Sequence, residues 1–281
     1  MVNANIQIQD VHVDYPVEGR GMRHILNGID LEIESGEFVS VVGQTGCGKS
    51  TLLRLILGEE IPTRGRVMVD GRERCQPDPT CGYVPQRYSL FPDKTVLGNV
   101  TFGLEVTEGG PFSLLRPARR KWMRKYREEA LRYLRHTGLQ EADARKYPHQ
   151  LSGGMQQRVA IAQALIMKPP VLLMDEAFSA LDPGTRSGMQ RLIKELWRES
   201  GTTIVFVTHN TREAVCLGTR IIALAKDSSG ELGSSVALDR SVPHLDFDSD
   251  EETIRCLIRE VESATLPRVQ DARSQITPAY N

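Results

Sequence analysis

The residues best suited to chemistry lie in the stretch Gly43-Gln-Thr-Gly-Cys-Gly-Lys-Ser50, which has the spacing G-x-x-x-x-G-K-S. A short apolar, β-branched run (38–42) precedes it, and apolar residues with helical spacing follow it over 51–57. Between a strand and a helix, such glycines let backbone N–H groups converge on a phosphate. Lys49 can reach the β- and γ-phosphates, and the Ser50 hydroxyl can ligate Mg²⁺. The stretch predicts a nucleoside triphosphate site.

Two acidic residues follow another continuously apolar run, which spans 171–174. At the end of a buried strand, Asp175 can bind Mg²⁺ through the water shell of the metal, and Glu176 can polarise an attacking water. A plainer interpretation is that the two acids only end the strand and cap the next helix. Beside a phosphate-binding loop, the pair instead favours hydrolysis of a γ-phosphate.

A second anion site is predicted at Leu151-Ser-Gly-Gly-Met155, where an apolar helical pattern begins. Ser152 is also a plausible plain N-cap. The bare amides of Gly153 and Gly154 nevertheless suit a phosphate, because they stand at a helix N-terminus. The chain therefore has two predicted phosphate-binding surfaces, and only one of them is a phosphate-binding loop.

The remaining pattern predicts an α/β fold. Alternating stretches at 6–15 and 26–33 predict an antiparallel edge, and short strands are expected at 66–69 and 82–86. From about 91 to 147 the pattern is helical. Continuously apolar strands at 171–174, 203–207 and 221–224 alternate with helical segments, which indicates a mostly parallel sheet covered on both faces. After about Asp227 the pattern weakens, an acidic run follows over 246–252, and 270–281 is expected to fray.

Composition excludes several classes of protein. The chain has 281 residues with 35 Lys+Arg against 36 Asp+Glu, so no global polycation points to nucleic acid, and no such partner is expected. Five cysteines without a C-x-x-C pair argue against a disulfide framework and a zinc site, and Cys47 is expected to pack. No signal peptide is recognised, and no apolar run approaches the roughly 20 residues of a membrane span. We expect a soluble protein of a reducing compartment.

A basic cluster overlaps the start of the helical pattern at 121–134. A solvated helix face is the plainer interpretation. The alternative is a surface for anionic lipid headgroups or for an acidic partner. The cluster comprises Arg116, Arg119, Arg120, Lys121, Arg124, Lys125 and Arg127.

In their order and spacing, these motifs resemble an ATP-binding cassette (ABC) ATPase over about residues 4–226. In the terms of that family, Gly43–Ser50 matches Walker A, 171–175 with Glu176 matches Walker B and the catalytic glutamate, and 151–155 matches the signature motif. The resemblance adds the adenine-stacking aromatic Tyr15, the Q-loop glutamine Gln86, the D-loop 179–182 and the switch histidine His209. The stretch 106–120 departs from the family, because it is longer than the usual link between helices.

The resemblance implies a P-loop NTPase (RecA-like) fold: a mostly parallel sheet core, an antiparallel β edge and a helical signature subdomain. It implies a nucleotide-binding domain at 1–228, with the helical subdomain at about 91–160, and a C-terminal extension at 229–281 that is partly a disordered tail. Glu176 and His209 would be catalytic, and Ser50, Gln86 and Asp175 would hold Mg²⁺. ATP would contact Tyr15, Gly43, Gln44, Thr45, Gly46, Cys47, Gly48, Lys49, Ser50, Thr51, Gln86, Ser152, Gly153 and Gly154.

In the resembled family, the signature of one subunit covers the ATP held by the other, so a second copy of the chain is an expected partner. Transmembrane permease subunits are expected too, with a solute-binding protein as a further candidate. The segment 90–104 resembles bacterial importers of the nitrate, sulfonate and taurine group, which implies a peripheral protein at the cytoplasmic face of the inner membrane. The alternative is a soluble ABC protein of DNA repair, translation or membrane remodelling. Repair and translation members usually carry two cassettes or a long coiled-coil insert, and this sequence has neither.

Overall fold

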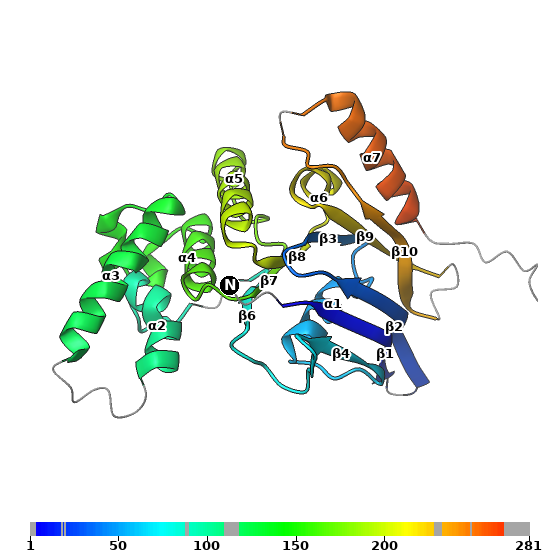
Figure 1. Cartoon of the computed structure of the whole chain (residues 1–281), viewed down its shortest axis with the longest axis horizontal. Helices are drawn as coiled ribbons and strands as arrows, with labels where there is room; N and C mark the ends of the chain where they lie inside the picture. Colours follow the sequence, from blue (N-terminus) through cyan, green and yellow to red (C-terminus); the bar gives the residue numbers. More distant parts are fainter. Residues whose placement is uncertain are drawn as a thin grey trace, which may run out of the picture.

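The computed structural model describes residues 4–17, 19, 21–87, 90–109, 118–227, 232–247 and 249–266. Within this part of the chain, a single sheet of ten strands runs through the molecule in the order β5-β4-β1-β2-β10-β9-β3-β8-β7-β6 (Figure 1). The helices lie beside this sheet, and some of them gather at one end of the molecule.

Parallel strands form one half of the sheet. They are β3 (Phe38–Gly43), β6 (Cys81–Val84), β7 (Val171–Asp175), β8 (Thr203–Val207) and β9 (Arg220–Lys226). Every residue of β7 and β8 is buried, as expected for strands covered on both faces. The predicted parallel core is confirmed. One strand is shorter than predicted: β6 ends before Pro85, which has no N–H for the ladder.

Antiparallel strands form the other half of the sheet, as predicted. β1 (Ile6–Val17) pairs on one side with β2 (Gly21–Ile33) and on the other with β4 (Arg64–Val69), which continues into the short β5 (Arg72–Glu73). The side chains of β1 and β2 alternate between buried and more exposed positions over much of their length, because one face packs on the core.

The helices divide into two groups. α1 (Lys49–Leu57), α5 (Pro183–Ser200) and α6 (Thr211–Leu217) accompany the sheet, and their apolar residues join its cores. α2 (Val96–Gly109), α3 (Ala118–His136) and α4 (Gly153–Ile166) share a separate hydrophobic core, to which two short 3₁₀ turns (Glu141–Arg145 and Pro148–Gln150) contribute. This second group is the helical subdomain, at the left of Figure 1.

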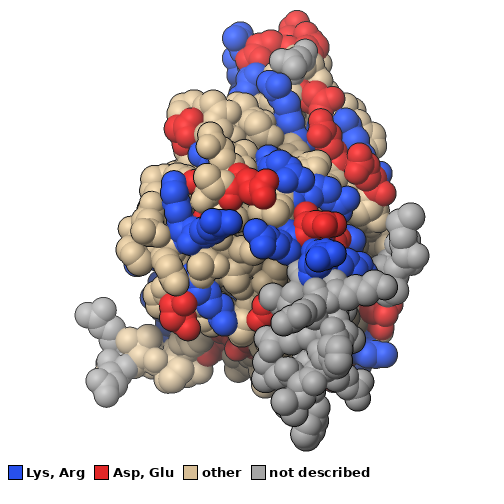
Figure 2. Space-filling model, turned by 90° about the vertical axis from the view of Figure 1, so that its left-hand side faces the viewer, with Lys and Arg blue, Asp and Glu red and all other residues tan. Residues whose placement is uncertain are grey.

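Figure 2 looks onto the outer face of the helical subdomain, where Lys and Arg side chains are spread among fewer acidic ones. From the predicted basic cluster, Arg124, Lys125 and Arg127 are exposed on α3 and form no ion pair with a described residue. Residue 116 lies outside the described residues, as does most of the long link that includes it. Both interpretations of the cluster stay predictions.

Two elements of the C-terminal part were not predicted. β10 (Ser234–Ser241) pairs antiparallel with β9 and touches β2, so it joins the two halves of the sheet. α7 (Glu251–Ala264) buries Ile254, Leu257 and Val261, whose helical spacing was hidden behind the acidic run. The acidic run has a structural use, because Asp250 caps α7 by accepting a hydrogen bond from the Thr253 amide. The predicted tail at 270–281 lies outside the described residues.

One buried cation ties this C-terminal part to the rest of the molecule. The Lys194 ammonium on α5 donates to the carbonyl of Cys216 (2.7 Å), to the carbonyl of Leu245 and to the Asp246 carboxylate (2.7 Å). The Lys194 hydrogen bond holds the pKa of Asp246 below its ordinary value. Arg198 approaches the same carboxylate at 3.5 Å from an exposed position.

The first prediction compares these two cations. Lys194→Met keeps the length of the side chain but leaves buried carbonyls without their donor, so we expect a loss of about 2 kcal/mol in the free energy of unfolding. Arg198→Met removes an exposed partner of the same carboxylate and should cost under about 1 kcal/mol. Urea unfolding followed by circular dichroism measures both variants. Equal losses would show that the buried lysine has no special role.

Candidate functional site

The phosphate-binding loop connects β3 to α1, as the sequence predicts. Gly43, Gly46 and Gly48 have φ angles of 154°, 74° and 91°, which side chains rarely adopt. At Gly43 a Cβ would come within 2.5 Å of the Leu224 carbonyl oxygen, and at Gly48 within 2.6 Å of a Leu26 methyl group. These two glycines are required by the backbone conformation and by the close approach of neighbouring strands.

The Lys49 side chain lies over the loop. Its ammonium donates to the carbonyl oxygens of Gly43 (2.8 Å) and Gln44 (3.0 Å), so the charge is held against the loop. Cys47 is buried, and burial raises the pKa of its thiol. It packs as predicted, and its thiolate is disfavoured. Gln44, Thr45 and Gly46 form the exposed rim of the loop.

Asp175 faces the start of α1 from the end of β7. It is 5% exposed, and burial raises its pKa, which a hydrogen bond from Ser50 partly opposes. A serine hydroxyl and a carboxylate are hard oxygen donors, which suit Mg²⁺. No group of three or more His, Cys, Asp or Glu side chains that could hold a metal occurs among the described residues. The donors fit an ion completed by phosphate oxygens and water.

Three predicted residues meet beside Asp175. The Gln86 amide donates to Glu176 Oε2 (2.7 Å), and His209 Nδ1 lies 3.4 Å from the same oxygen. The Glu176 amide bonds to the Val207 carbonyl at 2.9 Å, which fixes its backbone against β8. Its φ of 46° is uncommon for a residue with a side chain. The second carboxylate oxygen, Oε1, has no hydrogen bond to a described residue, so it is free to accept one from water.

Tyr15 stands on β1 near the C-terminal side of the loop. Its hydroxyl donates to Glu60 and interacts with Thr51, the third residue of α1. Burial is the main reason why the pKa of Tyr15 is raised. The structure therefore brings Tyr15 to the phosphate-binding loop. Stacking on adenine stays a prediction.

The segment predicted as a second anion site begins α4. Ser152 is its N-cap and accepts a hydrogen bond from the Met155 amide (3.3 Å). Gly154 lies next to the loop 179–182, since a Cβ there would be 3.5 Å from the Ala180 carbonyl oxygen. No hydrogen bond between described residues joins 152–154 to the phosphate-binding loop of the same chain.

Sequence reasoning missed two buried residues next to His209, namely Thr208 and Glu213. Thr208 donates to Glu213 Oε2 (2.8 Å), and the Glu213 amide bonds to Asn210 Oδ1 (3.2 Å). The order Asn210-Thr-Arg-Glu213 is a helix-capping pattern, which could have identified the start of α6 and its acidic residue.

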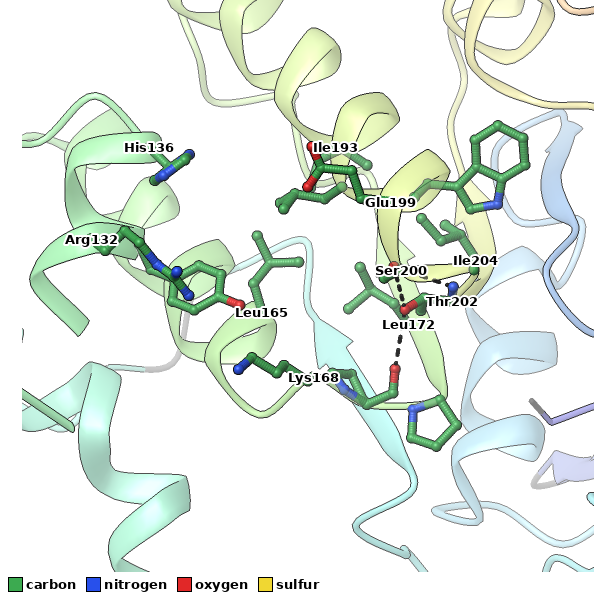
Figure 3. A pocket seen from close by; sticks show the side chains of 16 residues that line it. Arg132, His136, Leu165, Lys168, Leu172, Ile193, Glu199, Ser200, Thr202 and Ile204 are labelled. Carbon is green, nitrogen blue, oxygen red and sulfur yellow. Dashed lines mark hydrogen bonds between the residues drawn. The ribbon is translucent and has the colours of Figure 1, made fainter. Parts of the chain in front are cut away.

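A cavity of about 690 Å³ lies at the opposite, amino-terminal edge of the parallel strands (Figure 3). Apolar side chains such as Leu165, Leu172 and Ile204 line it, with Arg132 and Lys168 on one wall. Both cations approach the Glu129 carboxylate, at 3.6 Å and 2.6 Å. The predicted site residues lie at the other edge of the sheet.

Comparison with known proteins agrees with this geometry. The family model described as "ABC transporter" matches residues 26–179. The chain belongs to the ABC transporter family. A 43% identical relative, the uncharacterized ABC transporter ATP-binding protein MJ0412 of Methanocaldococcus jannaschii, aligns over 78% of this chain and 76% of its own length.

Two further relatives of this ABC protein carry transport names. The aliphatic sulfonates import ATP-binding protein SsuB of Zymomonas mobilis is 40% identical, over 86% of this chain and 88% of the relative. The bicarbonate transport ATP-binding protein CmpC of Synechococcus elongatus is 39% identical over 86% of this chain, which spans only 35% of CmpC.

A solved structure resembles the ABC chain as well. The ATP-binding cassette MJ0796, in a dimeric post-hydrolysis state bound to ADP and Pi, superposes with a TM-score of 0.73 at 34% identity, covering 85% of this chain and 99% of that one. The predicted P-loop fold and the ATPase activity are confirmed: the chain is an ABC-type ATPase. Within the described residues, no helix has the length and hydrophobicity to cross a membrane.

The second prediction concerns Lys49. Lys49→Ala removes the charge that the loop holds for the β- and γ-phosphates, so affinity for a fluorescent ATP analogue should fall at least about 30-fold. Lys168→Ala, at an exposed lysine on the far edge of the sheet, should bind like wild type. Affinity of Lys49→Ala within about threefold of wild type would contradict the phosphate-binding role.

Proposed function

We propose that this ATPase is the subunit that energises solute import by a membrane ABC transporter. The observation that carries the chemical part is the cluster of Gln86, Glu176 and His209 at the end of β7, beside Asp175. The names of the import proteins SsuB and CmpC support the transport part. Transmembrane permease subunits are then its partners, and a solute-binding protein is a further one.

ATP would lie along the phosphate-binding loop, with Tyr15 against the adenine. Residues 43–51 would hold the phosphates, and Lys49 would exchange its backbone acceptors for phosphate oxygens. Ser50, Asp175 and Gln86 would hold Mg²⁺, which neutralises charge on the phosphates when bound. The oxygen donors of these side chains support this assignment.

Glu176 is assigned as the general base. Gln86 and His209 both approach Oε2, which orients the carboxylate and leaves Oε1 to accept the proton of the attacking water. His209 would also contact the γ-phosphate, since its side chain is 64% exposed at the mouth of the site. The positions of Gln86 and His209 around the Glu176 carboxylate support both catalytic assignments.

Within the described residues, 152–154 make no hydrogen bond to the phosphate-binding loop of their own chain, which leaves this helix N-terminus available to a second copy in a dimer with shared sites. Ser152, Gly153 and Gly154 would cover the ATP held by a second copy of the chain, whose own signature helix would cover the first ATP. The dimeric state of the similar cassette MJ0796 agrees with this arrangement. The chain would work as a peripheral protein at the cytoplasmic face of the inner membrane, attached through its permease.

For domain organisation, we propose a nucleotide-binding domain over 1–228, whose helical subdomain includes about 91–160, and an extension over 229–281. The place of β10 in the central sheet favours counting 234–241 with the domain itself.

The alternative function, a soluble ABC ATPase in a non-transport process, differs in its partners. Co-purification of the tagged chain from membranes with a multi-spanning protein supports import, whereas recovery of the chain alone favours the alternative.

The third prediction tests the general base. Glu176→Gln should bind ATP with Mg²⁺, but its kcat should fall at least about 100-fold, because an amide cannot accept the proton from water. The ATP-bound dimer should then accumulate and elute earlier in size-exclusion chromatography. Glu199→Gln, an exposed carboxylate on α5, is the matched control. Full activity of Glu176→Gln would place the base elsewhere.

The fourth prediction tests sites shared between two copies. Lys49→Ala and Ser152→Arg should each be inactive alone, since each homodimer carries one lesion in both sites. In a mixed dimer, one site carries both lesions and the other carries none, so mixing under subunit exchange should restore part of the hydrolysis. If exchange is verified and no activity returns, labelled nucleotide distinguishes two causes. One nucleotide per mixed dimer indicates coupled sites, and none indicates that Ser152 acts within its own chain.

A further inference from the structure

His209 has an exposed side chain between two anchored neighbours. Its imidazole reaches solvent and Glu176, whereas Thr208 is 2% exposed and Asn210 caps α6. Glu213, in the first turn of α6, is 7% exposed and points back toward this segment. A buried carboxylate one turn after a catalytic residue needs a physical reason, because removing it from water is costly.

Glu213 closes a ring of hydrogen bonds around the backbone of His209. Thr208 Oγ1 donates to Glu213 Oε2 (2.8 Å) and accepts from the Asn210 amide (3.0 Å). The Asn210 side chain in turn accepts from the Glu213 amide (3.2 Å). The Thr208 hydroxyl has one proton, which it donates to the carboxylate, so its oxygen acts only as an acceptor toward the Asn210 amide.

The other oxygen of Glu213 attaches this ring to α5. Oε1 accepts from Gln190 Nε2 (3.0 Å), and Gln190 is itself buried. Arg186 Nε lies 4.0 Å from the same oxygen and provides the cation that a buried carboxylate requires. Arg186 also donates to the Leu181 carbonyl (3.0 Å), in the loop 179–182 that begins α5. Glu213 therefore connects the His209 segment to α5 through Gln190 and Arg186, and Arg186 also reaches that loop.

We propose that Glu213 is a positioning residue for ATP hydrolysis, which holds the His209 segment at a fixed distance from Glu176 through Thr208 and Asn210. The inference rests on the proposed role of His209. An imidazole 3.4 Å from the Glu176 carboxylate keeps its place only if its backbone does, and a displacement of about 1 Å is enough to slow catalysis strongly. Loss of the ring should affect turnover and leave ATP binding unchanged, because Glu213 does not contact the phosphate-binding loop in any hydrogen bond between described residues.

The test is a double-mutant cycle of Glu213→Gln and His209→Ala in the full chain, with kcat and KM for ATP as readouts. Glu213→Gln keeps the shape but replaces one acceptor with a donor, so kcat should fall about tenfold with KM within twofold of wild type. In the His209→Ala background, the same substitution should change the residual rate less than twofold. Glu195→Gln, an exposed carboxylate on α5, should have wild-type kinetics.

A second readout does not depend on residual activity. The chain has six histidines, and with ¹⁵N-labelled histidine the ring signals of His209 are those missing from His209→Ala. Glu213→Gln should shift these signals, while the other five histidines keep theirs, which excludes general unfolding.

If Glu213→Gln does not fold, Thr208 provides the same test. Thr208→Val removes the hydroxyl and should lower kcat about tenfold, and Thr208→Ser, which keeps the hydroxyl, should have the kcat of wild type.

Three results would overturn the proposal: equal losses of kcat with and without His209, a raised KM at unchanged kcat, or His209 signals that do not respond to Glu213→Gln. Failure of the proposed function looks different. If His209→Ala itself turns over like wild type, the catalytic role of His209 is wrong. If His209→Ala is slow and both Glu213→Gln and Thr208→Val are as fast as wild type, only the positioning role of Glu213 is wrong.

Discussion

The parallel register around Val207 is the constraint on which the site depends. This residue of β8 pairs with Val41 of β3 on one side and with Asp175 of β7 on the other, and its carbonyl accepts the amide of Glu176. Parallel strands in register end at one edge of the sheet, so the phosphate-binding loop, the acidic pair and the His209 segment must emerge together. Burial of β7 and β8 holds this register, since a slip would move apolar side chains out of the core.

Uncommon backbone conformations occur where these strands end. Gly43 and Gly48 turn the chain with φ angles that bring it close to neighbouring strands, and Glu176 adopts a φ of 46° directly after β7. For a residue with a side chain, a positive φ angle costs about 1 kcal/mol or more, so the surrounding contacts must hold the residue in place. For Glu176 those contacts are the Val207 carbonyl and the amide of Gln86. The Val207 carbonyl holds the backbone of Glu176, and the Gln86 amide orients its carboxylate.

The helix α5 connects the site to distant parts of the molecule. Near its start, Arg186 and Gln190 approach Glu213, and one turn later Lys194 holds the segment after β10. Toward its end, the Trp197 indole donates to the Gly36 carbonyl ahead of β3 (2.8 Å). Gln190 and Lys194 are buried at two of these points, and each donates a hydrogen bond to an acceptor outside α5. A displacement of α5 would therefore break contacts both to the His209 segment and to the segment after β10.

The sequence by itself determined the parallel core, the antiparallel edge, the phosphate-binding loop and the roles expected of Lys49, Asp175 and Glu176, because strand periodicity and glycine spacing are local properties. It did not predict β10 or α7, since the sequence of β10 is largely polar with a single β-branched residue, and the acidic run concealed the helix. Only the tertiary structure decided that Gln86 and His209 meet one oxygen of Glu176 and that the Glu213 carboxylate accepts a hydrogen bond from Thr208, next to His209. Those contacts join residues on different elements, and their distances depend on how the sheet and α5 pack, which no spacing along the chain specifies.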